Sequence, residues 1–175
     1  IPPGALASDQ TIEITKTAAP APSGYTAASA IYHLAPEGLV FTQNVTVTLE
    51  LASVASHTRV FWSKIGGPGF DDRGGTISGS SITAANTHFS DVFAGLLPVE
   101  LAITPATTDF GTVGVATTSP GTVFTVENFG AQETGTLAAT ITGSGASAFA
   151  ITQTTCTTLG TDESCATIGR SRRLW

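Results

Sequence analysis

His88, Phe89 and Ser90 place a candidate general base two residues before a hydroxyl nucleophile. A histidine can take the proton of a serine hydroxyl as the serine attacks a carbonyl carbon. In hydrolases, however, these groups converge from separate elements around an oxyanion hole, whereas immediate neighbours such as Ser90 and Asp91 splay apart on a strand. A turnover hydrolase is therefore not expected. The plainer interpretation is a closing strand, with Phe89 in the core and His88 and Ser90 pointing outward.

Cys156 and Cys165 are the two cysteines of the chain, and eight residues separate them. Two nearby cysteines in a sequence of exported character indicate one disulfide. The alternatives fit less well, because the Cys-x-x-Cys spacing of redox sites is absent and two lone thiols rarely hold structural zinc.

The other residues with ligand chemistry are scattered. His33 and His57 are isolated, without a second histidine or cysteine at ligand spacing, so no metal and no cofactor are expected. Asp71 and Asp72 lie in a glycine-rich stretch that matches no calcium-loop spacing, and a solvated turn is expected there. The sequon at Asn44 to Thr46 stands at the head of a predicted strand and is interpreted as chance.

The composition excludes several classes of function. The 175 residues carry a net charge of −6, and three of the seven basic residues are Arg170, Arg172 and Arg173, so nucleic acid is not an expected partner. Charged residues make up 11% and hydrophobic ones 41%, which excludes ordinary charged disorder. No apolar run is long enough to span a membrane. A soluble, extracytoplasmic protein is expected, and because no leader precedes Ile1, a fragment of a longer chain.

Short alternating runs bounded by Gly, Pro, Asn and Ser predict an all-β chain. Strands are predicted at residues 11–15, 30–34, 44–51, 58–65, 75–77, 88–95, 101–103, 122–126, 136–142 and 148–152. The proline-flanked segment near residues 97–100 predicts a boundary between two tandem antiparallel β-sandwiches. We expect domains at 1–97 and 98–169, and an atypical basic tail at 170–175.

The first half resembles a ZU-five domain over about residues 1–95. The resemblance rests on IPPGAL at residues 1–6, TIEIT, LAPEGLVFTQNVTVTLEL at residues 34–51, and THFSDVFAG at residues 87–95. It implies a β-sandwich that here lacks its usual first strand. In some members of the family His-Phe-Ser is a self-cleavage site, which implies that role for His88, Phe89 and Ser90.

The implied chemistry is an N-to-O acyl shift. Ser90 Oγ attacks the carbonyl carbon of Phe89, the amide is exchanged for an ester, and water then hydrolyses that ester, with His88 as the base. The reaction needs a scissile peptide twisted from planarity and donors for the developing oxyanion. Neither requirement is visible in the sequence.

The second half resembles an immunoglobulin-like repeat of the choice-of-anchor D type, related to the domains of hydin, over about residues 100–168. The resemblance rests on DFGTV at residues 109–113, the strand leading into Asn128-Phe129-Gly130, and Phe149-Ala150-Ile151 before the cysteines. Relatives continue after the second cysteine as a strand, whereas here the chain gives way to GRSRRLW. A missing last strand and marginal stability are therefore expected for this half.

The resemblances imply a non-enzymatic structural or adhesive module of a secreted or cell-surface protein of bacterial type. The alternatives are a self-cleaving module and, by analogy of fold, a protein-docking module. The expected partners are neighbouring domains of a longer parent chain and a protein or glycan surface ligand. The expected location is extracellular, at the cell surface or periplasmic.

Overall fold

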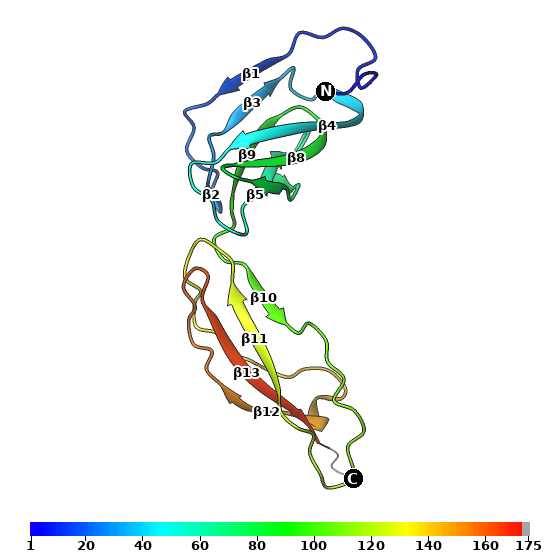
Figure 1. The fold of residues 1–175 in the computed structure, drawn as a ribbon, viewed down its shortest axis with the longest axis vertical. Coiled ribbons are helices and arrows are strands. Elements are labelled where there is room, and N and C mark those ends of the chain that lie inside the picture. The colour runs from blue at the N-terminus through cyan, green and yellow to red at the C-terminus, as the bar shows by residue number, and fades with distance from the viewer. Residues whose placement is uncertain (173–175) are drawn as a thin grey trace. The chain divides into compact units, whose positions relative to one another are not determined.

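The computed structural model describes residues 1–172 and shows an all-β chain built from antiparallel sheets (Figure 1). The chain divides into two compact units, one ending at Leu97 and the other beginning at Pro98. The helical structure within residues 1–172 is one 3-10 turn, η1 (Ala146–Ala148).

The first unit contains a six-stranded sheet and a three-stranded sheet. The larger sheet has the order β1-β3-β9-β5-β6, with β2 also paired to β9, and the smaller has the order β4-β8-β7. The strands are β1 (Glu13–Lys16), β2 (Thr26–Ala27), β3 (Tyr32–Ala35), β4 (Val40–Glu50), β5 (Arg59–Ser63), β6 (Phe70–Asp72), β7 (Thr76–Ser78), β8 (Ser81–His88) and β9 (Asp91–Leu96).

The core of this unit is made by the alternating side chains of the two sheets. In β4, Val45 and Leu49 are buried while the threonines between them face water, as the period of two along a strand requires. These side chains belong to one buried cluster with Val60 and Trp62 of β5 and Val92 of β9. Trp62 is completely buried.

A second apolar cluster forms from the alternate residues of the larger sheet. Phe61 and Phe93, which alternate with the core residues of β5 and β9, are buried against Tyr25 and Phe70. The rings of Tyr25 and Phe61 lie edge to face with their centroids 4.7 Å apart, and those of Phe70 and Phe93 5.1 Å apart. Both faces of β5 and β9 are therefore covered, which is why these strands read as nearly continuous apolar runs.

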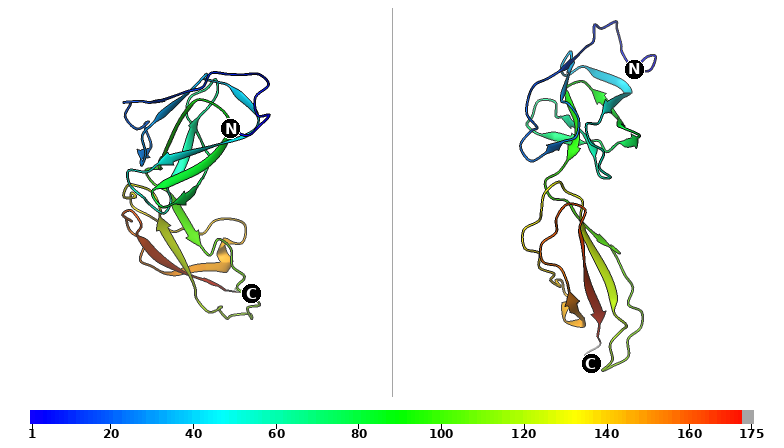
Figure 2. Two further views of the ribbon diagram at one scale, coloured as in Figure 1. Left: turned by 45° about the horizontal axis from the view of Figure 1, so that its top comes forward. Right: turned by 60° about the vertical axis from the view of Figure 1, so that its left-hand side comes forward.

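The second unit holds one four-stranded sheet of order β10-β11-β13-β12. Its strands are β10 (Leu101–Thr104), β11 (Thr122–Asn128), β12 (Phe149–Thr154) and β13 (Ser164–Ser171). The long segments before and after β11 run as loops in all three views (Figures 1 and 2). The strand predicted at residues 136–142 is not formed, although the amides of Thr134 and Leu137 donate to the carbonyl oxygens of Leu159 and Thr157.

The apolar face of the second sheet is thinly covered. Phe110 contacts Phe149, with ring centroids 5.5 Å apart, yet Phe149 is 37% exposed and Ile103 51% exposed. The buried apolar residues of the described part of this unit are Leu159 and Cys165.

The basic tail expected from residue 170 begins inside a strand. Arg170 and Ser171 continue β13, which pairs with both β11 and β12, and the amide of Arg172 donates to the carbonyl oxygen of Ala148. The alternation of apolar residues stops after Ile168, so sequence pattern gave no sign of this continuation. The rest of the expected tail, residues 173–175, lies outside the described residues.

Candidate functional site

His88, Phe89 and Ser90 lie where the chain passes from the smaller sheet of the first unit to the larger one. His88 ends β8, and β9 begins at Asp91, so Phe89 and Ser90 form the connection. All three residues are buried, with exposed fractions of 6%, 4% and 2%. The core position predicted for Phe89 is correct, whereas the outward orientation predicted for His88 and Ser90 is wrong. His88 takes an inward position of β8 by the same alternation as Asn86, and Ser90 lies in the connection, where its hydroxyl turns to the carbonyl oxygen of Ser63.

The carbonyl oxygen of Ser63, at the end of β5, receives both polar side chains of the motif. Ser90 Oγ lies 2.9 Å from it and His88 Nε2 lies 3.1 Å from it. A carbonyl oxygen only accepts, so the serine hydroxyl donates its proton there and Nε2 of His88 carries a hydrogen. The Ser63 hydroxyl also accepts a hydrogen bond of 3.0 Å from the amide of Asp91. Ser63 therefore holds both ends of the connection: its carbonyl oxygen accepts from His88 and Ser90, and its hydroxyl accepts from the amide of Asp91.

Both ring nitrogens of His88 lie close to Asn86. Nδ2 of Asn86 is 3.3 Å from His88 Nδ1, 3.4 Å from His88 Nε2 and 3.3 Å from the carbonyl oxygen of His88. The contact with the carbonyl oxygen requires the amide nitrogen at that position, so its second hydrogen is available to Nδ1. Both nitrogens of His88 thus have partners other than the Ser90 hydroxyl, and the histidine is not placed to take that proton.

The peptide groups around Phe89 are held by the turn before β4. The amide of Phe89 donates to the carbonyl oxygen of Leu39 at 2.9 Å, and the amide of Gly38 donates to the carbonyl oxygen of Phe89 at 2.8 Å. The Phe89 ring packs edge to face on Phe41, with centroids 4.8 Å apart. An amide donor therefore does face the carbonyl that an acyl shift would attack, but in an arrangement that also satisfies ordinary backbone pairing.

Sequence reasoning missed the residues that define this site, namely Ser63, Asn86 and Gly38. Ser63 is 25 residues from His88 along the chain, and no spacing rule links the two. Asn86 could have been identified from the sequence, because it takes an inward position of β8 at the same two-residue spacing as Ile82 and Ala84.

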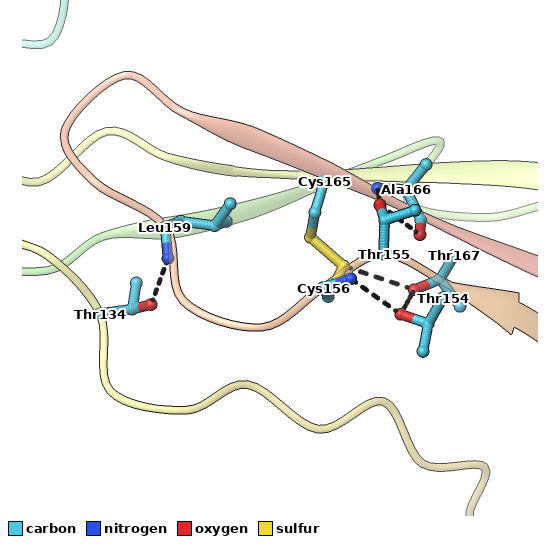
Figure 3. Close-up of a disulfide and its surroundings, with 8 residues drawn as sticks. All are labelled: Thr134, Thr154, Thr155, Cys156, Leu159, Cys165, Ala166 and Thr167. Atoms are coloured by element: carbon cyan, nitrogen blue, oxygen red, sulfur yellow. Dashed lines mark hydrogen bonds between the residues drawn. A yellow bond between two sulfur atoms is a disulfide. The ribbon is translucent and has the colours of Figure 1, made fainter.

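Cys156 and Cys165 form the predicted disulfide, which is confirmed (Figure 3). It links Cys156, two residues beyond the end of β12, to the second residue of β13, and these two strands are paired neighbours. Figure 3 shows Thr154 and Thr167 beside Cys156: their hydroxyl oxygens lie 3.0 Å apart, and the amide of Cys156 donates to Thr154 Oγ1 at 3.2 Å. The disulfide therefore lies beside hydrogen bonds made by the side chains of Thr154 and Thr167.

Asn128 holds the loops beside the disulfide. Its side chain is fully buried at the end of β11, and Nδ2 donates to the carbonyl oxygens of Gln132 at 2.7 Å and Leu159 at 3.2 Å. Its Oδ1 accepts from the amide of Gly130 at 3.0 Å. Leu159 is tied in addition to Thr134, whose hydroxyl accepts from its amide at 2.9 Å (Figure 3). The Asn-Phe-Gly sequence is therefore a loop-organising element.

The scattered polar residues do not converge into a metal site. Nδ1 of His33 pairs with Asp91 Oδ1 at 2.7 Å, and His57 is half-buried in the turn before β5. Asp71 lies 3.0 Å from Arg73, and Asp72 lies 2.9 Å from Arg59. Within residues 1–172, no three His, Cys, Asp or Glu side chains are grouped so as to hold a metal ion.

Two further findings concern the whole described chain. Comparison with protein-family models, with curated proteins and with solved structures returned no match. Residues 1–172 include no helix of the length and apolarity needed to cross a membrane.

Proposed function

We propose that this chain is a non-enzymatic structural or adhesive module of a secreted or cell-surface multidomain protein. The observation that carries the proposal is the shared acceptor at Ser63. The carbonyl oxygen of Ser63 accepts hydrogen bonds from both Ser90 Oγ and His88 Nε2, so this serine and this histidine help to join the two sheets. A self-cleaving module would need the histidine to accept the serine proton.

The disulfide and the surface support the extracytoplasmic part of the proposal. Disulfides form and persist in oxidising compartments and are rare in the cytosol. The solvent-facing side of β4 carries threonines, and the chain as a whole has 11% charged residues with a net charge of −6. Such a surface fits a chain that presents loops to a protein or glycan ligand, and the exposed turn at residues 64–69 between β5 and β6 is a candidate.

The proposal is tested by intact mass under denaturing conditions, before and after prolonged incubation, with Ser90→Ala beside the unaltered chain. We expect a single species of 17.7 kDa for the unaltered chain. Two fragments divided between Phe89 and Ser90, absent from Ser90→Ala, would overturn the proposal and establish the N-to-O acyl shift instead.

A further inference from the structure

Two buried polar atoms in the core beside His88 have no hydrogen-bond partner. They are Nε1 of Trp62 and Oδ1 of Asn86, and neither pairs with another group in the described part of the chain. Trp62 is 0% exposed and Asn86 is 2% exposed, so neither atom reaches the solvent. Buried polar groups in folded proteins are nearly always paired, because an unpaired one loses the hydrogen bonds that it makes in water. A donor and an acceptor in one part of the core therefore call for a shared partner.

The two side chains come from different sheets and flank the ring of His88. Trp62 takes an inward position of β5 in the larger sheet, and Asn86 takes an inward position of β8 in the smaller one. The rings of Trp62 and His88 lie edge to face with their centroids 6.3 Å apart. Asn86 Nδ2 lies 3.3 Å and 3.4 Å from the two ring nitrogens of His88. The unpaired donor and the unpaired acceptor thus belong to neighbouring side chains between the two sheets.

The contacts of Asn86 determine which of its atoms is left over. Its Nδ2 lies 3.3 Å from the carbonyl oxygen of His88, and that oxygen only accepts, so the amide nitrogen belongs at this position. Turning the amide over would set Oδ1 against the same carbonyl oxygen. Oδ1 therefore stays on the far side of the amide group, as an acceptor that needs a hydrogen.

We propose that one buried water molecule joins these two atoms, accepting from Trp62 Nε1 and donating to Asn86 Oδ1. A direct bond between them is not formed, so the bridge needs a small molecule that accepts on one side and donates on the other. A metal ion does not fit, because the indole N–H only donates. An anion does not fit either, because Oδ1 only accepts. Buried waters typically make two to four hydrogen bonds to groups of this kind.

The water completes a polar network that joins the two sheets. Ser63 follows Trp62 on β5, and its carbonyl oxygen already accepts from His88 Nε2 and Ser90 Oγ. The bridge from Trp62 to Asn86 adds a second link between β5 and β8, one residue away from the first. It also explains why an amide, and not an apolar side chain, fills an inward position of β8.

The first experiment detects the water from the indole proton of Trp62. The whole chain with Trp175→Phe, labelled with nitrogen-15, gives one indole N–H signal, because the sequence has two tryptophans. A water held for long beside this proton gives laboratory-frame and rotating-frame Overhauser cross peaks of opposite sign at the water frequency. Hydrogen exchange with the solvent gives the same sign in both. We expect opposite signs, and we expect them to persist when Ser90→Ala removes the hydroxyl proton of the network that could imitate water.

A double-mutant cycle tests whether the water joins the two side chains. Trp62→Phe removes the donor and Asn86→Leu removes the acceptor, and unfolding is followed by far-ultraviolet circular dichroism. Because both substitutions break the same bridge, their combined effect on the unfolding equilibrium constant should depart from the product of the single effects by about fivefold or more. Trp62→Phe with Ser90→Ala is the matched control. Ser90 bonds to Ser63 and not to the bridge, so this pair should agree with the product within about twofold.

Cross peaks of equal sign, or none at the water frequency, would overturn the proposal, because the indole proton would then exchange with solvent or have no water beside it. Loss of the cross peaks in Ser90→Ala would also overturn it, by tracing the signal to a hydroxyl proton. So would independent effects of Trp62→Phe and Asn86→Leu, since a shared water couples them. Where a variant does not fold, the spectra of the Trp175→Phe chain decide.

Discussion

Ser90 and Ser63 are joined by a hydrogen bond of 2.9 Å, in which the hydroxyl of Ser90 donates to the backbone carbonyl oxygen of Ser63. The bond links the connection between the two sheets to the end of β5, 27 residues away. It also fixes the serine proton on an acceptor that is not a base. The polar residues of the His-Phe-Ser motif therefore have a structural role: they hold the connection between the two sheets to β5.

Ser90→Ala is expected to leave the covalent chain unchanged and to weaken the first unit slightly. The lost bond is worth about 1 kcal/mol, and the carbonyl oxygen of Ser63 keeps its bond from His88 Nε2, so no buried acceptor is left unpaired. Denaturant unfolding monitored by tryptophan fluorescence measures the loss, since Trp62 lies in the same core. A loss above about 3 kcal/mol would contradict this account of the site.

Phe89→Ala is expected to cost far more than Ser90→Ala. The ring is 4% exposed and packs on Phe41, so its removal takes away buried area and leaves a cavity between the sheets, at a cost of about 3 to 5 kcal/mol. The same unfolding measurement applies. Val54→Ala is the control, because Val54 is 57% exposed and its truncation should change the free energy of unfolding by less than about 0.5 kcal/mol. Equal effects of the two substitutions would show that Phe89 is not a core residue.

Alternation predicted the strands whose inward residues are apolar. β4 was found with boundaries a few residues off, because Val45 and Leu49 mark its buried face. β9 was found as an apolar run, since its central residues are buried on both faces. β8 was missed as a strand of its own. Its inward positions run Ile82, Ala84, Asn86, His88, so the apolar signal fades where the strand continues.

A sequence motif alone does not determine what its residues do in this site. His88 and Ser90 are close in the sequence, but the carbonyl oxygen that accepts from both belongs to Ser63 of β5, which only the folding of distant segments brings to them. The disulfide was predictable, because two cysteines allow a single pairing within the chain. The second unit was harder to predict, since its loops are fixed by side chain to backbone bonds of Asn128, which have no periodicity.

Gly130→Ala is expected to destabilise the second unit severely. A Cβ atom at Gly130 would lie 2.4 Å from the carbonyl oxygen of Pro98 and 2.5 Å from Cα of Val99, and both are backbone atoms that cannot rotate away. Overpacking of this kind costs about 1 to 3 kcal/mol or more. Thermal unfolding of the second unit measures a loss of stability of that size. Gly135→Ala is the matched control, because its Cβ would meet nothing within 4 Å. A Gly130→Ala chain as stable as Gly135→Ala would show that the loop approaches less closely.

The two units should unfold in separate transitions, with the second unit first, and removal of the disulfide should move the second unit's transition alone. The first unit holds a large buried core, whereas the second leaves Phe149 and Ile103 partly in water. Replacing both Cys156 and Cys165 with alanine frees a loop of about ten residues in the unfolded chain, which lowers stability by roughly 2 to 3 kcal/mol in the chain-entropy model. Differential scanning calorimetry of both chains checks this. The upper transition, which belongs to the first unit, is the internal control. If it shifts as much as the lower one, the two units do not unfold independently. If neither transition moves, the hydrogen bonds between the threonines of β12 and β13 already hold the loop without the disulfide.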